Sequence, residues 1–335
     1  MRKRYYIWGG FLVILLILAI FASAFSLSTG EIRIRLSEIP GILREQSGIE
    51  YSILTKIRIP RMILAFAVGG ALSLTGAILQ GIYRNPLVEP YTLGISGGAA
   101  LGVALVIVMG IHLERGALML PAGGFIGALL AVTLVFTLSY KRGTIHINRM
   151  LLIGVMVSFV ASAAMMFLMA VTTSANLHSI IFWIMGSLDE PNTTLIKITS
   201  LASIAGLIIS LLYARPLNAL RLGEEKARHL GVNSNRAVRV LFVLASLLTG
   251  ISVSVAGVIG FVGLIIPHMI RFLVGSDYRF LLAGSFLGGG LFLIICDMIA
   301  RVIIAPNELP VGVITGILGG VVFIGMLSKL KLSGD

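Results

Sequence analysis

The sequence predicts an all-α polytopic membrane protein with about ten transmembrane helices in a single domain, residues 1–335. Hydrophobic residues make up 57% of the chain and charged residues only 12%, about half the charged share of a soluble domain. Apolar runs recur along the whole length, and the mean hydropathy is +1.03. The 39 glycines are typical of helices that pack closely in lipid.

Ten apolar runs are long enough, or nearly so, to cross a bilayer. The first run follows a cluster of basic residues and precedes Ala22, Ser23 and Ala24, which resembles a signal peptide. Because that run is about 19 residues long, we expect an uncleaved first helix. The expected spans are about 7–28, 62–82, 92–110, 117–139, 150–171, 193–213, 237–256, 258–273, 280–303 and 309–328.

The distribution of basic residues predicts the orientation in the membrane. With ten spans, both termini lie on one side. If that side is the cytoplasm, cytoplasmic segments hold roughly 17 of the 26 Lys and Arg residues but only about five of the 14 acidic residues. This placement accounts for the net charge of +12 better than nucleic-acid binding does. We therefore expect a cell-membrane protein with both termini in the cytoplasm.

A polar segment, LGEEKARHLGV at 222–232, is the longest interruption between apolar runs in the second half of the chain. Gly223 and Gly231 bracket a short predicted helix. Glu224 and Glu225 occupy its first turn and basic residues follow, an order that suits the helix dipole. The segment predicts a short soluble helix at the cytoplasmic membrane surface; an ordinary charged loop is the alternative.

Glycine and proline predict two interruptions of regular helix. In 251–271, Gly257, Gly260 and Gly263 recur at three-residue spacing and Pro267 follows. This pattern favours a broken or re-entrant element buried in protein, with a glycine-faced helix as the alternative. The loop RNPLVEP at 84–90 contains two X-Pro steps that stop a helix, so a rigid turn joins the second and third spans.

Charged residues near the outer membrane surface form two candidate features. Arg58 and Arg61 flank Pro60 at the mouth of the second span and predict a fixed cationic site. Asp297 and Arg301 are four residues apart on one helix face, so they pair, or Arg301 extends outward by snorkelling. For all three arginines, anchoring to lipid headgroups or in salt bridges is the alternative interpretation.

The sequence lacks the common catalytic and metal-binding motifs. It has no G-x-x-x-x-G-K-[ST] loop and no H-E-x-x-H, its five histidines are scattered, and its single cysteine, Cys296, lies in an apolar run. We expect no catalytic residue, metal site or bound cofactor. Met156, Met165 and Met169 of the fifth span are candidates for a soft pathway lining, with core packing or lipid contact as the alternative.

Six blocks occur in a fixed order along the chain: RIPR at 58–61, GALSLTGAILQGIYRNPLVEPYTLGISGGA at 70–99, GEEKARHLGV at 223–232, GVIGFVGLIIPHMIR at 257–271, DMIAR at 297–301 and ELPVGVITGILGGVVFI at 308–324. Together they resemble the permease subunits of type II ABC importers, the FecCD family, which carries iron-siderophores, haem and cobalamin. The resemblance covers essentially the full chain.

The resemblance implies partners for this chain. We expect a homodimer, or a heterodimer with a close relative, together with two cytoplasmic ATPase subunits that hold ATP and Mg and an extracytoplasmic binding protein. Coupling helices at about 217–232 would contact the ATPase. The expected coupling residues are Leu222, Gly223, Glu224, Glu225, Arg228, Leu230 and Gly231.

The resemblance also implies roles for other residues. Arg58, Arg61 and Arg301 would meet acidic residues of the binding protein, and the fifth and tenth spans would line the pathway. The positions that match the inner gate are Asn85, Leu87, Ile147 and Asn148.

The expected function is import of a metal chelate by alternating access. A ferric siderophore is the first expectation for the passenger, and haem and cobalamin are the alternatives. Two other classes remain open at this point: an ion-coupled secondary transporter, and a non-transporting scaffold or receptor.

Overall fold

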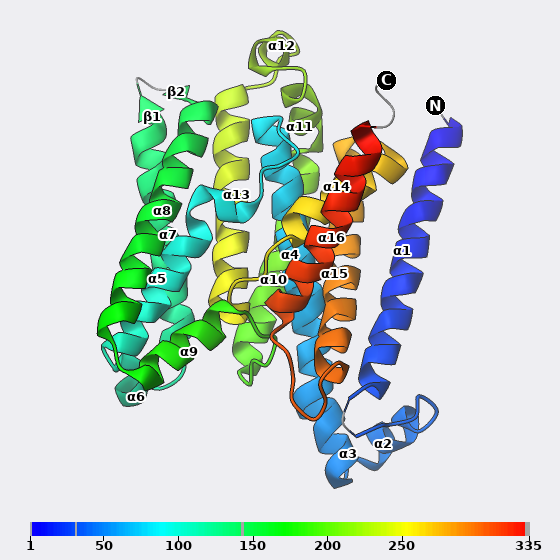
Figure 1. Cartoon of the computed structure of the whole chain (residues 1–335). Helices are drawn as coiled ribbons and strands as arrows, with labels where there is room; N and C mark the ends of the chain where they lie inside the picture. The colour runs from blue at the N-terminus through cyan, green and yellow to red at the C-terminus, as the bar shows by residue number, and fades with distance from the viewer. Residues whose placement is uncertain (1, 31, 142–143, 332–335) are drawn as a thin grey trace.

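The computed structural model describes residues 2–30, 32–141 and 144–331; Met1, residue 31 and the ranges 142–143 and 332–335 lie outside the described residues. Within the described chain each of the ten expected spans is a helix (Figure 1). These are α1 (Arg2–Ser28), α4 (Ile59–Tyr83), α5 (Ile95–Val108), α7 (Met119–Ser139), α8 (Ile147–Val171), α10 (Thr193–Leu212), α13 (Ser234–Ala256), α14 (Val262–Val274), α15 (Tyr278–Val302) and α16 (Val311–Lys331).

Among the described residues, seven helices are long and apolar enough to cross a membrane, and three apolar helices are shorter. The shorter ones are α5, α14 and the Val311–Met326 part of α16. In the second span, α3 (Gly48–Ile53), a π-helical turn η1 (Leu54–Arg58) and α4 run on as one helix of 36 residues. The predicted all-helical membrane fold is confirmed.

Short elements connect the spans. They are α2 (Ile39–Glu45), η2 (Pro90–Leu93), α6 (Ile111–Arg115), α9 (Ser174–Ile184), α11 (Ala214–Leu220) and α12 (Glu224–His229), with an antiparallel pair of two-residue strands, β1 (Tyr140–Lys141) and β2 (Thr144–Ile145). The sequence analysis did not anticipate α9 or the strand pair.

The connecting elements divide between the two ends of the helix bundle. Figure 1 shows both ends of the chain, α11, α12 and the strand pair at one end, and α2, α3 and α6 at the other. We call these the α12 end and the α3 end. The polar segment and both termini therefore share one end, as an even number of spans requires.

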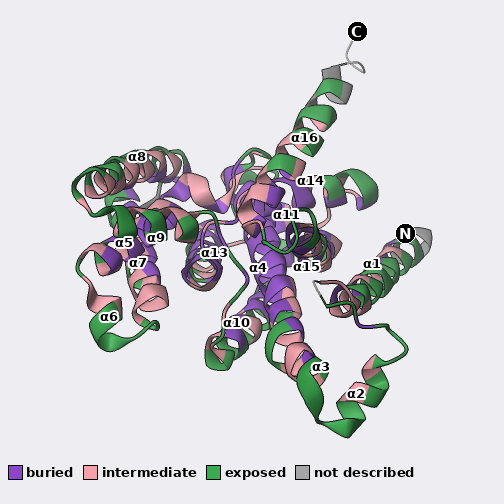
Figure 2. Ribbon diagram, turned by 60° about the horizontal axis from the view of Figure 1, so that its bottom comes forward, coloured by how far each residue is buried: buried purple, intermediate pink, exposed green. Residues whose placement is uncertain are grey.

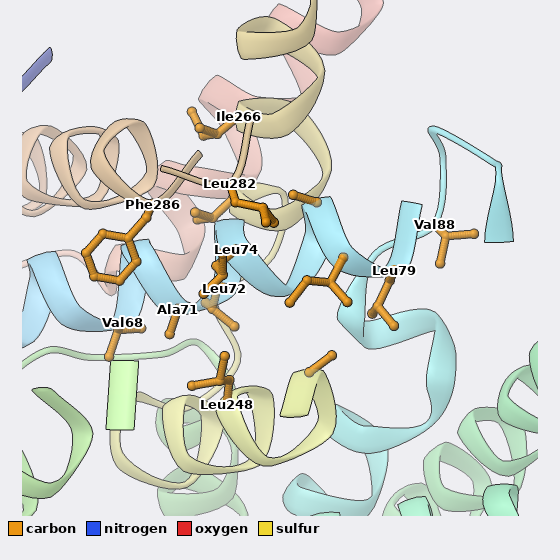
Figure 3. Close-up of a cluster of buried hydrophobic side chains, with 14 of the residues drawn as sticks. Val68, Ala71, Leu72, Leu74, Leu79, Val88, Leu248, Ile266, Leu282 and Phe286 are labelled. Carbon is orange, nitrogen blue, oxygen red and sulfur yellow. The ribbon is translucent and has the colours of Figure 1, made fainter. Parts of the chain in front are cut away.

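Helix α4 forms the centre of the bundle, and most of its length is buried (Figure 2). Its apolar side chains lie among those of α13, α14 and α15, including Leu248, Ile266 and Leu282 (Figure 3). Glycines permit this close approach: a Cβ atom on Gly76 would lie 1.8 Å from the carbonyl oxygen of Gly263. Small residues thus bring these backbones together, as van der Waals packing in lipid requires.

The predicted break in 251–271 is confirmed. Helix α13 ends at Ala256 and α14 begins at Val262, and Phe261 between them has a positive φ of 68°. The unwound backbone finds partners in protein, because Ile259 N donates to the Tyr91 hydroxyl at 3.0 Å and Gln80 Nε2 donates to the Gly263 carbonyl oxygen at 3.3 Å. Irregular backbone at membrane depth requires such internal partners.

Candidate functional site

The predicted coupling segment forms two short helices, α11 and α12, that project from the α12 end of the bundle (Figure 1). Gly223 and Gly231 have φ values of 109° and 79°, which permit the turns on either side of α12. Ala227 in the middle of α12 is fully buried against the bundle. Glu224 and Glu225 lie in the first turn of α12, as predicted.

The outer surface of this segment combines charged and apolar side chains. Leu222 is 58% exposed and Leu230 is 63% exposed, one on each side of α12. Glu225 and Arg228 lie exposed between them, and Glu224 is half-buried. We call Leu222, Glu225, Arg228 and Leu230 the coupling face. Exposed leucines beside charges on a projecting helix are typical of a surface that docks another protein.

A pair of hydrogen bonds attaches this segment to the start of α15. Asn218 Nδ2 donates to Asp277 Oδ1 at 2.7 Å, and Asn218 Oδ1 accepts from Tyr278 N at 3.0 Å. The same Asp277 oxygen caps α15 by accepting from Arg279 N at 3.0 Å. We call this the Asn218–Asp277 clamp. The clamp was not predicted from the sequence. Its one local signal is the aspartate before an apolar run, which is typical of a helix N-cap.

A second connection lies beside the clamp. Arg221 Nη1 donates to the Ser276 carbonyl oxygen at 2.5 Å. Asn218 of α11 and Arg221, directly after it, therefore hold the loop that joins α14 to α15.

Four charged residues form a cluster at the α3 end of the bundle. Arg61 Nε lies 2.8 Å from Asp297 Oδ1, and Arg301 Nε lies 3.1 Å from Asp297 Oδ2. Arg61 Nη1 also lies 2.7 Å from Glu308 Oε2. We call these four residues the outer ion cluster. The predicted pairing of Asp297 with Arg301 is confirmed, and Arg61 joins it from α4.

The guanidinium groups of the three predicted docking arginines are directed into the protein. Arg58, Arg61 and Arg301 are only 6–8% exposed. Arg58 donates to the carbonyl oxygens of Leu27, at 2.6 Å, and Ile32. Internal acceptors thus hold the predicted cationic site around Pro60 in place, and its role in docking stays a prediction.

Arg301 holds the end of α1 in the same way. Its Nη2 donates to Ser26 Oγ at 2.7 Å, and its Nη1 donates to the Thr29 carbonyl oxygen at 3.0 Å. The salt-bridge alternative raised by the sequence fits the geometry, and α1, α4 and α15 are joined at their outer ends.

A cavity of about 530 Å³ also lies at the α3 end. Arg115, Trp183, Asp189 and Glu190 are among the residues that line it. Burial raises the pKa of the Glu190 carboxyl, a hydrogen bond from Asn192 N at 2.8 Å opposes this rise, and the charge of Asp189 adds to it. The cavity gives this end a second polar surface, away from the outer ion cluster.

The predicted gate residues are not all directed toward open space. Asn85 Oδ1 accepts from Leu87 N at 2.9 Å, which fixes the turn, and Leu87 is 53% exposed. Asn148 is exposed at the start of α8, but the neighbouring Ile147 is buried in the main core. Ile147 is thus a packing residue in this conformation, and Leu87 and Asn148 are the gate candidates with exposed side chains.

The methionines of α8 divide between two faces. Met165 and Met169 pack against a small core formed by α5 and α9, with Val103 and Ile180 among its members. Met156 is exposed beside a groove between α5, α7 and α8. Packing within the subunit, the alternative raised for these methionines, fits Met165 and Met169, and the pathway role of all three stays a prediction.

Among the described residues, no three His, Cys, Asp or Glu side chains are grouped as metal ligands. The buried Cys296 lies in the apolar middle of α15.

Comparison with known proteins assigns the chain to a family. A family profile described as the FecCD transport family matches residues 15–329. The chain belongs to the FecCD transport family. It is 39% identical over 324 residues to the hemin transport system permease protein of Yersinia pestis, covering 96% of this chain and 95% of that protein. It is also 39% identical over 275 residues to a cobalamin import system permease protein of Halobacterium salinarum, covering 82% and 73%.

Solved structures agree with this assignment. An inward-facing transporter assigned to the metal-chelate ABC type is 30% identical, has a TM-score of 0.83, and matches 96% of this chain and 99% of its own. PsaBC from Streptococcus pneumoniae, at 17% identity and a TM-score of 0.55, shares the fold. This FecCD protein is thus a multi-pass ABC transporter permease.

Proposed function

We propose that this chain is the membrane subunit of an importer that moves a metal chelate into the cytoplasm by alternating access. Two permease subunits would enclose the pathway, two ATPase subunits would dock below them, and an extracytoplasmic binding protein would dock above. A homodimer is the simplest assembly, and a close relative could replace one copy. The chain itself supplies the pathway and the transmission, and its partner supplies ATP hydrolysis with ATP and Mg.

The coupling face is the observation that carries this proposal. It projects from the bundle on α12, at the same end as the two termini, and it exposes Leu222 and Leu230 beside charged residues. Because most of the basic residues lie in segments of this end, the positive-inside rule supports a cytoplasmic position for it. An ATPase that acts from the cytoplasm would meet this surface first.

Helix α15 is the proposed route of transmission. The Asn218–Asp277 clamp holds its first residues to α11, and the outer ion cluster holds its last turns to α4. A ligand shifts a conformational equilibrium only through different affinities for the two states. In this proposal ATP acts through the coupling face, and α15 connects that movement with the binding-protein side.

Two observations support the proposed transported substrate. A ferric siderophore is the expectation from the sequence. The relative named for hemin transport aligns with nearly the whole chain, which makes haem the second candidate, and cobalamin is the third. All three are bulky chelates, so one alternating-access mechanism serves each of them.

Uptake by reconstituted proteoliposomes tests the proposal. Liposomes that contain the permease and its co-encoded ATPase, supplied with the co-encoded binding protein, should accumulate one of three radiolabelled probes: ferric enterobactin, haemin or cyanocobalamin. Uptake should require internal ATP and the binding protein, and a protonophore should leave it unchanged. Uptake that persists without ATP and collapses with a protonophore would select an ion-coupled carrier instead.

A further inference from the structure

Glu308 differs from the other members of the outer ion cluster in its exposure. Its side chain is 48% exposed, whereas Arg61, Asp297 and Arg301 are 1–8% exposed. It lies in the loop between α15 and α16, where Leu309 N donates to the Ala300 carbonyl oxygen at 3.0 Å. Glu308 therefore covers Arg61 from the solvent side.

The two carboxylates of the cluster differ in the number of arginines that they contact. Both oxygens of Asp297 are used, one by Arg61 and the other by Arg301. Among the described residues, Glu308 forms its salt bridge with Arg61, through one oxygen. In the described part of the chain the neighbouring Arg58 donates to carbonyl oxygens and pairs with no acid, so this region carries three guanidinium groups for two carboxylates. An additional carboxylate is electrostatically favoured here.

A hollow of about 720 Å³ lies next to the cluster, on the side of Arg301. It lies at the same end of the bundle, and Arg33, Arg35 and Arg301 line it together with Thr29 and Pro306. Arg33 and Arg35 are both exposed, and Arg35 Nε lies 3.8 Å from Glu38 Oε1. The hollow borders the outer ion cluster at Arg301 and is cationic on several sides.

We propose that Glu308 is an internal substitute for a carboxylate of the docking binding protein. It covers Arg61 in the free permease, and an acidic side chain of the partner takes its place when the complex forms. This inference rests on the proposed function, and it accounts for arginines that are predicted to dock yet are buried. A partner that replaces one carboxylate with another avoids leaving a buried cation unpaired.

The exchange has a structural consequence. Glu308 lies three positions before Val311, the first residue of α16. Release of Glu308 from Arg61 frees the loop between α15 and α16 and with it the outer end of α16. Docking would thereby be sensed by a span that is expected to line the pathway.

The test measures docking of the fluorescently labelled binding protein that supports uptake in the proteoliposome assay. The permease is placed in nanodiscs and the Kd is measured at low and at high salt. Glu308→Gln should tighten docking at low salt by about three- to tenfold, because an acidic partner no longer competes for Arg61. Glu114→Gln, an exposed acid of α6 at the same end, should leave the Kd unchanged.

A spin label on Asn307→Cys provides a second readout of the exchange. Asn307 is exposed, and the native Cys296 is fully buried, so labelling is selective. The label should become more mobile when the binding protein docks, and it should already be mobile in the Glu308→Gln background.

Two results overturn the exchange: a Glu308→Gln Kd equal to or weaker than that of the unaltered chain, or a label that is equally restrained with and without the binding protein. Either leaves the importer proposal intact, because uptake has then been established separately. If no binding protein supports uptake at all, the proposed function itself fails.

Discussion

Asn218 and Asp277 are joined by a side-chain hydrogen bond of 2.7 Å although they lie 59 positions apart in the chain. Asn218 also accepts from the backbone of Tyr278, so a single amide holds both the cap and the first turn of α15. The clamp thus connects the projecting coupling segment directly with a membrane-spanning helix.

Removing the clamp should separate ATP hydrolysis from transport. Asn218→Ala deletes hydrogen bonds, one of them charge-assisted, that are together worth about 1–3 kcal/mol, while it leaves the coupling face untouched. We expect normal co-purification of the ATPase, retained hydrolysis, and uptake reduced severalfold in proteoliposomes. Asp277→Asn in an otherwise unaltered chain keeps a capping oxygen and should retain most of the uptake. Proportional loss of hydrolysis and uptake in Asn218→Ala would argue against a transmitting role.

Reversing charge on α12 should weaken the attachment of the ATPase. The double variant Glu224→Lys with Glu225→Lys removes the acidic first turn that the helix dipole favours, and it alters the docking surface. We expect at least a severalfold loss of co-purified ATPase, with the membrane fold retained. The control is Glu114→Lys at the opposite end of the bundle. Unchanged co-purification together with unchanged uptake would refute the coupling assignment.

Breaking the outer ion cluster should destabilise the subunit. Asp297→Asn leaves two buried guanidinium groups short of a countercharge, and removal of one partner from a buried ion pair costs about 3–5 kcal/mol. Thermal unfolding in nanodiscs should show this as a clear fall in Tm. Combining Asp297→Asn with Arg301→Met should recover part of the loss.

An exposed ion pair supplies the matched control for the cluster. Arg35 and Glu38 lie 3.8 Å apart and are 84% and 49% exposed. Because surface ion pairs contribute about 0–1 kcal/mol, Glu38→Gln should barely move the Tm. If Glu38→Gln and Asp297→Asn lowered the Tm equally, the outer ion cluster would have no special structural role.

The contact between α4 and the start of α14 should tolerate no added atom. A methyl group at Gly76 would meet the Gly263 backbone, so Gly76→Ala must separate the two elements, at a cost of about 1–3 kcal/mol. Gly10→Ala in α1 is the control, since a Cβ there has nothing within 4 Å. We expect a lower Tm and a lower yield for Gly76→Ala alone. Equal behaviour of the two variants would disprove the close contact.

The number of spans, the interruption before α14 and the turn after α4 were predictable from the sequence. Each depends on local properties: the length of an apolar run, the spacing of glycines, and prolines that a helix does not accommodate. The position of α12 was predictable for the same reason, because Gly223 and Gly231 bracket a segment too polar for the membrane. The short helix α9 was missed, since its apolar composition resembles that of the neighbouring spans.

The roles of the charged and polar side chains were decided by the tertiary structure. Arg61 pairs with an aspartate 236 positions away, and Arg301 donates to Ser26 over a separation of 275 positions. Neither partner is implied by helical periodicity, which relates only residues within a few turns. The sequence by itself therefore determined that this chain is a ten-span membrane protein of a recognisable family. Only the packing of distant helices decided that its outer arginines are buried, because their acceptors are assembled by the fold.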